Sequence, residues 1–233
     1  MIFVSIIYII AAYLLGAFPF MVIIGRAKGM DLSRERDLHE VLWNRIGRGW
    51  GILGVLVDVL KGVIPVLVGA WLQLPVPAVV LSALAALTGQ MWPVFNHFDG
   101  ERGNTTGLGI VLTLSLAYGA PWVSVIALSI IAIGVLIRTA KRWRQSGRNL
   151  NERLKFGGPP SIALPLSILL GLISCIVSSP LFNMDAAITV CFAAIVVLVL
   201  LRRLTGGLRQ DLITENNKTS VIINRLLFDR SHK

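Results

Sequence analysis

Long apolar runs alternate with short polar segments along almost the whole chain. The apolar runs cover residues 1–24, 51–73, 78–95, 108–137, 161–178 and 186–201. A helix of about 20 apolar residues is long enough to cross the hydrocarbon core of a bilayer. We therefore expect an all-α fold, a polytopic membrane helix bundle, rather than a water-soluble domain.

The composition agrees with a membrane protein. Apolar residues make up 55% of the 233 residues, charged residues make up 15%, and the mean hydropathy is +0.75. A water-soluble domain of this length could not bury so much apolar surface. Cys175 and Cys191 each lie in an apolar run, and the three histidines are too far apart in sequence for a ligand motif. We therefore expect no metal and no cofactor.

The positive charges cluster beside the apolar runs. Of the 22 Lys and Arg residues, 20 lie in the segments 26–49, 138–155 and 202–233. The positive-inside rule produces this distribution, which argues against nucleic acid as a partner in spite of a net charge of +10. It predicts that the three segments are cytoplasmic, with the N-terminus outside and the C-terminus inside.

The run 108–137 is interpreted as a pair of short spans. Gly119, Ala120 and Pro121 interrupt it near its middle. A single crossing would place the cationic segment that follows on the outer side, whereas crossings over 108–118 and 121–137 return the chain to the cytoplasm. The sequence thus predicts about seven spans, with a transmembrane domain over 1–203 and a cytoplasmic tail over 204–233.

Two charged residues interrupt the second span. Asp58 and Lys61 are spaced i, i+3, so they share one helix face and can form an ion pair. A charged side chain at the centre of a span costs about 2.5–3.5 kcal/mol on insertion scales. Two interpretations stay open: a structural pair near the inner interface, or a lysine that turns towards a bound phosphate while the aspartate orients it.

The stretch 89–109 gathers small and polar residues between two apolar runs. These residues are Gly100, Arg102, Gly103, Asn104, Thr105, Thr106, Gly107 and Gly109. An apolar run from Leu108 onward would place them at a helix N-terminus, where unpaired amides and the helix dipole favour a phosphate. Arg102 adds a fixed positive charge. The alternative is a tight loop whose threonines cap a helix.

The order of these motifs resembles that of the bacterial membrane-integral acyl-phosphate:glycerol-3-phosphate acyltransferases. The family's Gly-Ser-Ile-Pro-Phe and Lys-Gly-Ile-Asp resemble residues 16–20 and 28–31 of this chain. Its Asp-x-x-Lys-Gly resembles residues 58–62. Its Gly-His-Met-Phe-Pro-Val-Phe, followed by Phe-x-Gly-Gly-Lys-Gly-Val-Ala-Thr-Gly-Leu-Gly, resembles residues 89–95 and 98–109. The chain is thereby identified as a divergent member of that family.

The divergence falls on the active site that the resemblance implies. The family's Gly-Ser-Gly-Asn aligns with residues 36–39, so Asp37 and His39 stand in place of its serine and asparagine. Gln90 stands in place of a histidine, and Glu101 and Arg102 stand in place of a glycine and a lysine.

Three further family positions are matched less directly. Asn44 aligns with a family asparagine, and Ser161 ends a bend that corresponds to the family's Ser-Leu-Ala-Ser segment. The last motif, His-Arg-x-Asn-Ile, aligns either with residues 202–206 or with residues 224–227.

The resemblance implies transfer of an acyl group from acyl-phosphate to the 1-hydroxyl of glycerol 3-phosphate, which gives lysophosphatidate for phospholipid synthesis in the bacterial inner membrane. Lys61 and Arg102 are its candidate catalytic cations. Either His39 or a substrate phosphate oxygen acts as the general base. The candidate phosphate-binding residues are Arg102, Gly103, Asn104, Thr105, Thr106, Gly107, Lys61 and Asn44, with Asp58 and Ser161 in support.

The expected partners are acyl-phosphate, glycerol 3-phosphate and membrane lipids, together with an acyl-phosphate-producing enzyme that docks on the basic face. A rival hypothesis is a catalytically impaired paralogue that serves as a membrane scaffold or binds anionic lipid, since several motif residues are substituted. A transporter would need polar groups at mid-membrane, whereas Asp58 and Lys61 lie towards one end of their span.

Overall fold

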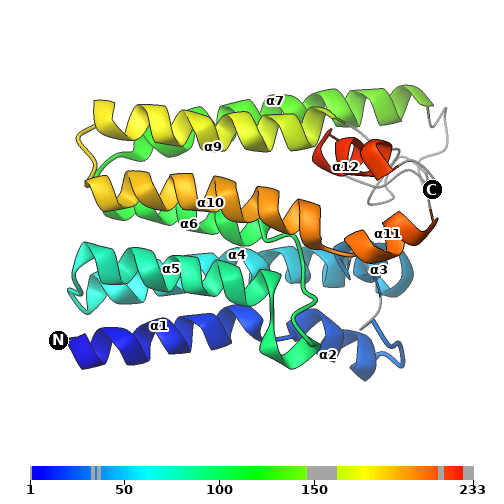
Figure 1. Ribbon diagram of the computed structural model, residues 1–233, viewed down its shortest axis with the longest axis horizontal. Coiled ribbons are helices and arrows are strands. Elements are labelled where there is room, and N and C mark those ends of the chain that lie inside the picture. The colour runs from blue at the N-terminus through cyan, green and yellow to red at the C-terminus, as the bar shows by residue number, and fades with distance from the viewer. Residues whose placement is uncertain (1, 33–34, 36–37, 146–161, 215–217, 228–233) are drawn as a thin grey trace.

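The computed structural model describes residues 2–32, 35, 38–145, 162–214 and 218–227, which form a bundle of helices (Figure 1). The long helices are α1 (Ile2–Ala17), α4 (Arg48–Trp71), α5 (Val76–Met91), α6 (Asn104–Ala117), α7 (Pro121–Gln145), α9 (Ala163–Leu181) and α10 (Ala186–Thr205). The short ones are α2 (Phe20–Ala27), α3 (Leu38–Val41), the π-helical turn η1 (Leu42–Ile46), the 3₁₀ turn η2 (Val94–Asn96), α11 (Leu208–Thr214) and α12 (Lys218–Leu227).

The long helices run side by side along one axis. Figure 1 shows a row that passes from α1 through the pair α4 and α5 and the pair α6 and α10 to the pair α7 and α9. Within the described residues, six helical segments are long and apolar enough to cross a membrane, and α6 is a shorter apolar helix. The prediction of an all-helical bundle with about seven spans is therefore confirmed.

The break predicted near Gly119 is present, and a further break interrupts the first apolar run. Pro19 separates α1 from α2, because proline has no amide hydrogen to donate within a helix. Gly119 adopts a left-handed φ of +77° between α6 and α7, and Pro121 begins α7. The short helix pair predicted over 108–137 is therefore present.

Several boundaries differ from the sequence prediction. Helix α6 begins at Asn104 rather than near Leu108, since Gly103 takes the left-handed conformation that precedes the first turn. Helix α7 continues to Gln145 because Lys and Arg are good helix formers and the helix can extend past the apolar region. The polar segment 26–49, expected to be a loop, contains α3 and η1.

Two glycines bring α4 and α6 into close contact. A Cβ atom on Gly62 would lie 2.2 Å from the carbonyl oxygen of Thr106, and one on Gly109 would lie 2.4 Å from that of Val59. Small residues at such positions let the backbones of membrane helices approach each other. This contact fixes the first turn of α6 against the charged part of α4.

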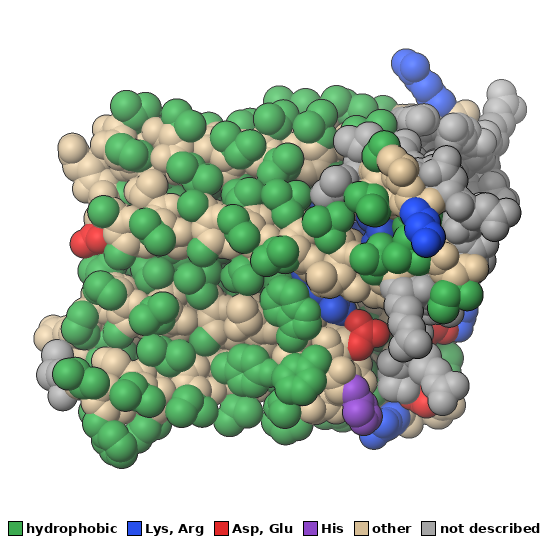
Figure 2. Space-filling model, viewed as in Figure 1, with side chains coloured by type: hydrophobic (Ala, Val, Ile, Leu, Met, Phe, Trp, Pro, Cys, Tyr) green, Lys and Arg blue, Asp and Glu red, His purple; other side chains and the backbone are tan. Residues whose placement is uncertain are grey.

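The charged side chains gather at one end of the bundle. Figure 2 shows hydrophobic side chains along the length of the helices and most of the charged ones at the end where α2, α3 and α11 lie, with an acidic side chain at the opposite end. Arg202 and Arg203, in the last turn of α10, belong to this end and are buried. The candidate site lies here.

Candidate functional site

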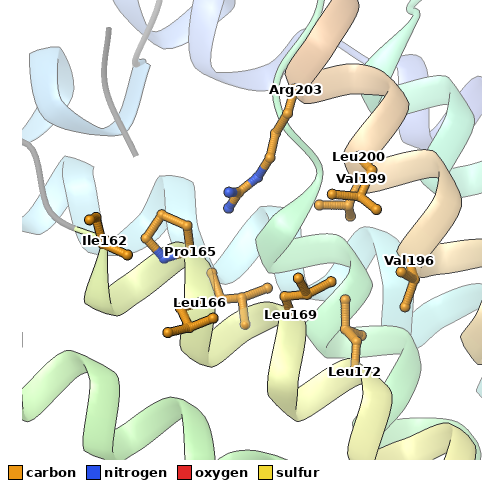
Figure 3. A pocket seen from close by; sticks show the side chains of 10 residues that line it. Ile162, Pro165, Leu166, Leu169, Leu172, Val196, Val199, Leu200 and Arg203 are labelled. Atoms are coloured by element: carbon orange, nitrogen blue, oxygen red, sulfur yellow. The ribbon is translucent and has the colours of Figure 1, made fainter. Parts of the chain in front are cut away.

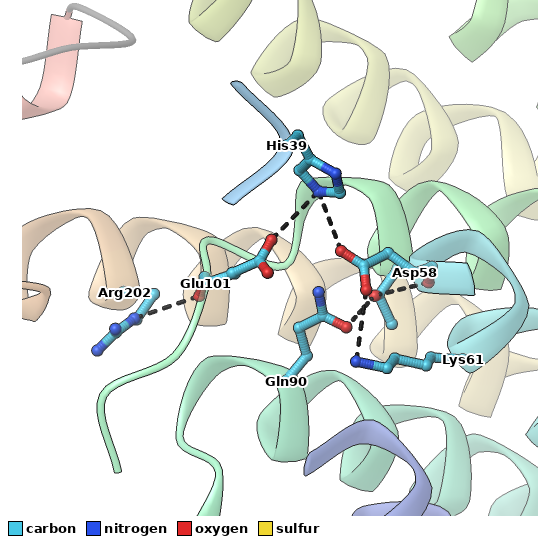
Figure 4. A network of polar contacts seen from close by, with 7 residues as sticks. His39, Asp58, Lys61, Gln90, Glu101 and Arg202 are labelled. Atoms are coloured by element: carbon cyan, nitrogen blue, oxygen red, sulfur yellow. Dashed lines mark hydrogen bonds and ion pairs between the residues drawn. The ribbon is translucent and has the colours of Figure 1, made fainter. Parts of the chain in front are cut away.

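A network of four charged side chains joins three segments at the polar end (Figure 4). The Nε2 atom of His39 lies 3.1 Å from Oδ2 of Asp58 and 3.2 Å from Oε2 of Glu101. The Nζ atom of Lys61 lies 3.4 Å from Oδ1 of Asp58. The Asp58 side chain is 1% exposed and that of Lys61 is 8% exposed. The ion pair predicted from their spacing is therefore present and buried.

Thr106 ties this network to the first turn of α6. Its hydroxyl oxygen lies 2.8 Å from the backbone carbonyl oxygen of Asp58 and 2.8 Å from Oε1 of Gln90. The hydroxyl shares its single proton between these two acceptors. Helices α4, α5 and α6 thus meet at one buried hydroxyl.

Arg202 holds the loop that carries Glu101. Its guanidinium donates to Oδ1 of Asp99 at 2.6 Å, to the carbonyl oxygen of Gly100 and to that of Glu101 at 3.3 Å. On the other side of the loop, the Glu101 amide donates to the carbonyl oxygen of Gln90 at 3.1 Å. The backbone of the loop is therefore fixed from α10 and from α5, which directs the Glu101 side chain towards His39.

The network changes the proton affinities of its two groups that lie outside the spans. Burial lowers the pKa of the His39 imidazole, but its contacts with the carboxylates of Asp58 and Glu101 outweigh burial and raise that pKa to about 10. Burial and the nearby Asp58 carboxylate raise the pKa of the Glu101 carboxyl group to about 7, since both disfavour its charged form. Near neutral pH, His39 is consequently a cation between two carboxyl groups.

An apolar groove lies between α9 and α10. Side chains of both helices form its walls, among them Pro165, Leu169, Leu172 and Val196. Figure 3 shows Arg203 reaching from α10 over one end of the groove. An elongated apolar ligand with an anionic head has the complementary chemistry.

The profile of a protein family described as glycerol-3-phosphate acyltransferase matches residues 6–209 of the chain. The chain belongs to the glycerol-3-phosphate acyltransferase family. The sequence resemblance noted over its motifs is thereby confirmed, and the protein is an integral, multi-pass membrane protein.

Two curated relatives illustrate the extent of the similarity. The chain is 35% identical to a glycerol-3-phosphate acyltransferase of Geotalea daltonii over 143 residues, which cover 60% of this chain and 69% of that relative. It is 40% identical to the protein of the same name from Glaesserella parasuis over 112 residues, which cover 46% of this chain and 54% of the relative. The matched segments thus span between about half and about two thirds of these relatives.

The fold is similar to that of PlsY (YgiH), described as an integral membrane glycerol 3-phosphate acyltransferase. Its crystal structure in the lysophosphatidic acid form superposes with a TM-score of 0.64, and covers 90% of this chain and 92% of that chain. The glycerol 3-phosphate form gives a TM-score of 0.65 and covers 90% of each chain. The identity to both is 23%, so this likeness concerns the fold.

The structure brings some of the predicted site residues of this family member together. His39, Asp58, Lys61 and Thr106 form one buried network, and Gly103 and Gly107 lie at the start of α6 beside it. Asn104 and Thr105 are half-buried in the same first turn.

Other predicted residues lie apart from the network. Arg102 and Asn44 are exposed, and Asn44 belongs to the π-helical turn η1. The structure therefore does not bury Arg102 beside Lys61, although the two cations were expected to line one cavity. Ser161 lies outside the described residues.

Three members of the site were absent from the predicted set. Gln90 and Glu101 stand at departures from the family pattern, which was the available signal for both. Arg202 was visible as a cation at the end of the last span and as one of two alignments of the last family motif. Its contact with residues 99–101 joins parts of the chain about a hundred positions apart, which sequence spacing does not reveal.

Proposed function

We propose that this family member transfers an acyl group from an acyl phosphate to the 1-hydroxyl of glycerol 3-phosphate and so forms lysophosphatidate. One observation carries the proposal: the helix that bears the buried Lys61 packs against the first turn of α6, at the polar end of a bundle that belongs to this family. Asp58, which pairs with Lys61, touches Thr106 of that turn, and Gly62 packs on the Thr106 backbone. A phosphate placed there meets a cation, helix amides and the helix dipole together.

The proposed phosphate site uses Lys61 and the residues from Gly103 to Gly107. The first amides of a helix have no partner within the helix, so they are available to an anion. Gly103 precedes α6 in the left-handed conformation and, having no side chain, cannot itself cap the first turn as serine or aspartate would. Arg102 and Asn44 are exposed on the same polar end. We assign them to the first contact with a phosphate that enters from solvent, and not to the phosphate in its bound position beside Lys61.

Acyl phosphate is already an activated donor, so the enzyme mainly has to orient the two substrates. The hydroxyl oxygen of glycerol 3-phosphate attacks the acyl carbonyl carbon, the bond from that carbon to the phosphate oxygen breaks, and phosphate leaves with the electron pair. His39 lies between two carboxyl groups and already carries its proton near neutral pH, so it cannot act as the base. The hydroxyl proton therefore passes to a phosphate oxygen. Lys61 stabilises the charge that develops in the transition state.

The groove between α9 and α10 is assigned to the acyl chain of the acyl phosphate. Two consecutive arginines support this assignment, since Arg202 contacts the loop of the site while Arg203 lies over the groove. The apolar walls suit an alkyl chain, and the guanidinium of Arg203 suits the anionic head to which the chain is attached.

We place the polar end of the bundle at the cytoplasmic face of the bacterial inner membrane. The clusters of positive charge support this orientation. Both the soluble substrate and an enzyme that produces acyl phosphate would reach the site from that side, while the acyl chain enters from the lipid.

The direct test is a product assay on purified protein in liposomes with radiolabelled glycerol 3-phosphate and palmitoyl phosphate. We expect labelled lysophosphatidate and released phosphate, and a rate about 10²–10³-fold lower in Lys61→Met, because a preorganised charge is lost. Lys218→Met, an exposed lysine on α12, is the matched control and should keep the wild-type rate.

The same assay decides between the enzyme and the impaired paralogue. The replacement of the family's serine and asparagine by Asp37 and His39 is what favours the paralogue. Folded protein that forms no lysophosphatidate from acyl phosphate, but binds anionic liposomes, would establish the paralogue instead.

A further inference from the structure

His39, Asp58 and Glu101 place one nitrogen and two carboxylate groups around a common point. Their ligand atoms all lie within 4.8 Å of one another, and the three residues come from α3, α4 and the loop before α6. Figure 4 shows the imidazole directed between the two carboxylates. The sequence separates these residues too widely for a recognisable ligand motif, so the fold alone assembles them.

Two of the three pairs of ligand atoms have the spacing of a coordination shell, and all three atoms lie within 4.8 Å of one another. Two ligands at about 2.1 Å from a metal ion are about 3.0 Å apart when they subtend a right angle and about 3.4 Å apart in a tetrahedron. The distances from His39 Nε2 to the Asp58 and Glu101 oxygens, 3.1 and 3.2 Å, lie between these values.

The Asp58 carboxylate gives a second, independent indication. The residue is fully buried, and neither of its side-chain oxygens accepts a hydrogen bond of good geometry, although His39 and Lys61 lie at ion-pair distance. Buried carboxylate oxygens are normally satisfied by hydrogen bonds or by a metal. The second carboxylate, from Glu101, adds negative charge at the same place.

We propose that His39, Asp58 and Glu101 bind one divalent transition-metal cation of the Zn²⁺ or Mn²⁺ type. The cation displaces the proton that the imidazole otherwise carries, because only a neutral imidazole is a metal ligand. Imidazole combined with carboxylate favours these cations over Mg²⁺ and Ca²⁺, which prefer ligand shells of oxygen alone. Three protein ligands leave further coordination positions open, and the partly exposed His39 and Glu101 side chains, at 13% and 19%, give a path from solvent. The inference rests on this geometry and does not depend on the proposed acyl transfer.

Two departures from the family pattern meet at this site. His39 stands where the family has asparagine and Glu101 stands where it has glycine, and the two side chains contact each other. Either change alone would place an extra ionisable group in a buried position. Together they supply two of the three ligands.

Lys61 has the opposite influence. Its ammonium group lies 3.4 Å from the Asp58 carboxylate and competes with a metal ion for that negative charge. Removal of the lysine charge should therefore strengthen metal binding, whereas it weakens phosphate binding and acyl transfer. The two proposals are thus separable in one variant.

The test is a titration of the purified, chelator-treated protein in detergent with Co²⁺, followed by visible absorption. We expect saturation at one equivalent, displacement by Zn²⁺, and no displacement by Mg²⁺ at the same concentration. His39→Asn and Glu101→Gly, which restore the family residues, should each weaken Co²⁺ binding by more than the roughly 10–100-fold that loss of an outer-shell partner costs. Lys61→Met should tighten it.

Elution from a sizing column confirms that each variant is folded before titration. Failure of the wild-type protein to bind Co²⁺ saturably would overturn the proposal. The cluster would then be a network of hydrogen bonds and ion pairs without a metal. Unchanged binding in both His39→Asn and Glu101→Gly, or equal displacement by Mg²⁺, would overturn it as well. Acyl transfer by a protein that binds no metal would leave the proposed function intact.

Discussion

At the scale of single residues, the buried charge of Asp58 organises the site. The sequence predicted its pairing with Lys61 from their spacing on one helix face, and the structure adds His39 and Glu101. The orientation of Glu101 could not be predicted, because Glu101 and Arg102 are neighbours and either could have faced inward. The contacts that Arg202 makes with the loop decide which of them does so.

Asp58→Asn tests whether this charge is structural as well as functional. The change leaves Lys61 buried without its counter-charge, and loss of one partner of a buried pair costs about 3–5 kcal/mol. Glu35→Gln is the matched control, because its pair with Arg45 is largely exposed at 36% and 61% and should contribute about 0–1 kcal/mol. Thermal unfolding in detergent compares the two variants, and equal losses of stability would contradict the assigned role.

At the scale of elements, the contact between α4 and α6 positions the site. The sequence predicted both helices and the charged face of α4, but it placed the start of α6 near Leu108, because the residues before it are small and polar. The left-handed Gly103 and the close packing of Gly62 on Thr106 bring that segment into the helix. Such packing depends on a partner helix, so it could not be predicted from local pattern.

Gly62→Ala tests this contact. The added methyl group would lie 2.2 Å from the Thr106 carbonyl oxygen, which forces the helices apart and costs about 1–3 kcal/mol of stability together with most of the activity. Gly49→Ala, in the same helix but with no atom near the added group, should instead stabilise the protein by about 0.4–1 kcal/mol. Unfolding temperature and initial rate, measured on both variants, separate these outcomes. Similar behaviour of the two would count against the packing argument.

Leu169→Trp tests the groove between α9 and α10. The larger ring fills part of the proposed chain site, so the preference between palmitoyl and decanoyl phosphate should shift towards the shorter chain by about tenfold or more. The neighbouring Leu170 is exposed and does not line the groove, so Leu170→Trp should leave the preference unchanged. The ratio of kcat/KM for the two donors is the measurement. An unaltered ratio in Leu169→Trp would place the acyl chain elsewhere.

At the scale of the whole molecule, hydropathy and charge predicted the number of spans and the polar end. Seven spans followed from the break at Gly119 and Pro121 and from the positions of the cations, and the helices agree. The tail was less predictable. Its helix α12 packs on the end of the bundle, since Val221 is buried and Arg225 donates to the Arg203 carbonyl oxygen at 3.1 Å. This docking depends on the shape of the folded end, which the amphipathic pattern of residues 221–228 does not by itself specify.

The predicted orientation can be checked by cysteine labelling in intact cells. The native cysteines, Cys175 and Cys191, are buried and should be inert. A membrane-impermeant maleimide should label Leu72→Cys, between α4 and α5, and should not label Thr219→Cys in α12 until the cells are opened. The reverse pattern would invert the topology and place the site on the outer face.

The proposed phosphate site lies between Lys61 and the first turn of α6. A crystal structure of the protein with bound glycerol 3-phosphate would show whether a phosphate binds there. We expect a phosphate oxygen within hydrogen-bond distance of Lys61 Nζ and of the backbone amides that follow Gly103. Phosphate density at another place, with Lys61 still paired only to Asp58, would contradict that expectation.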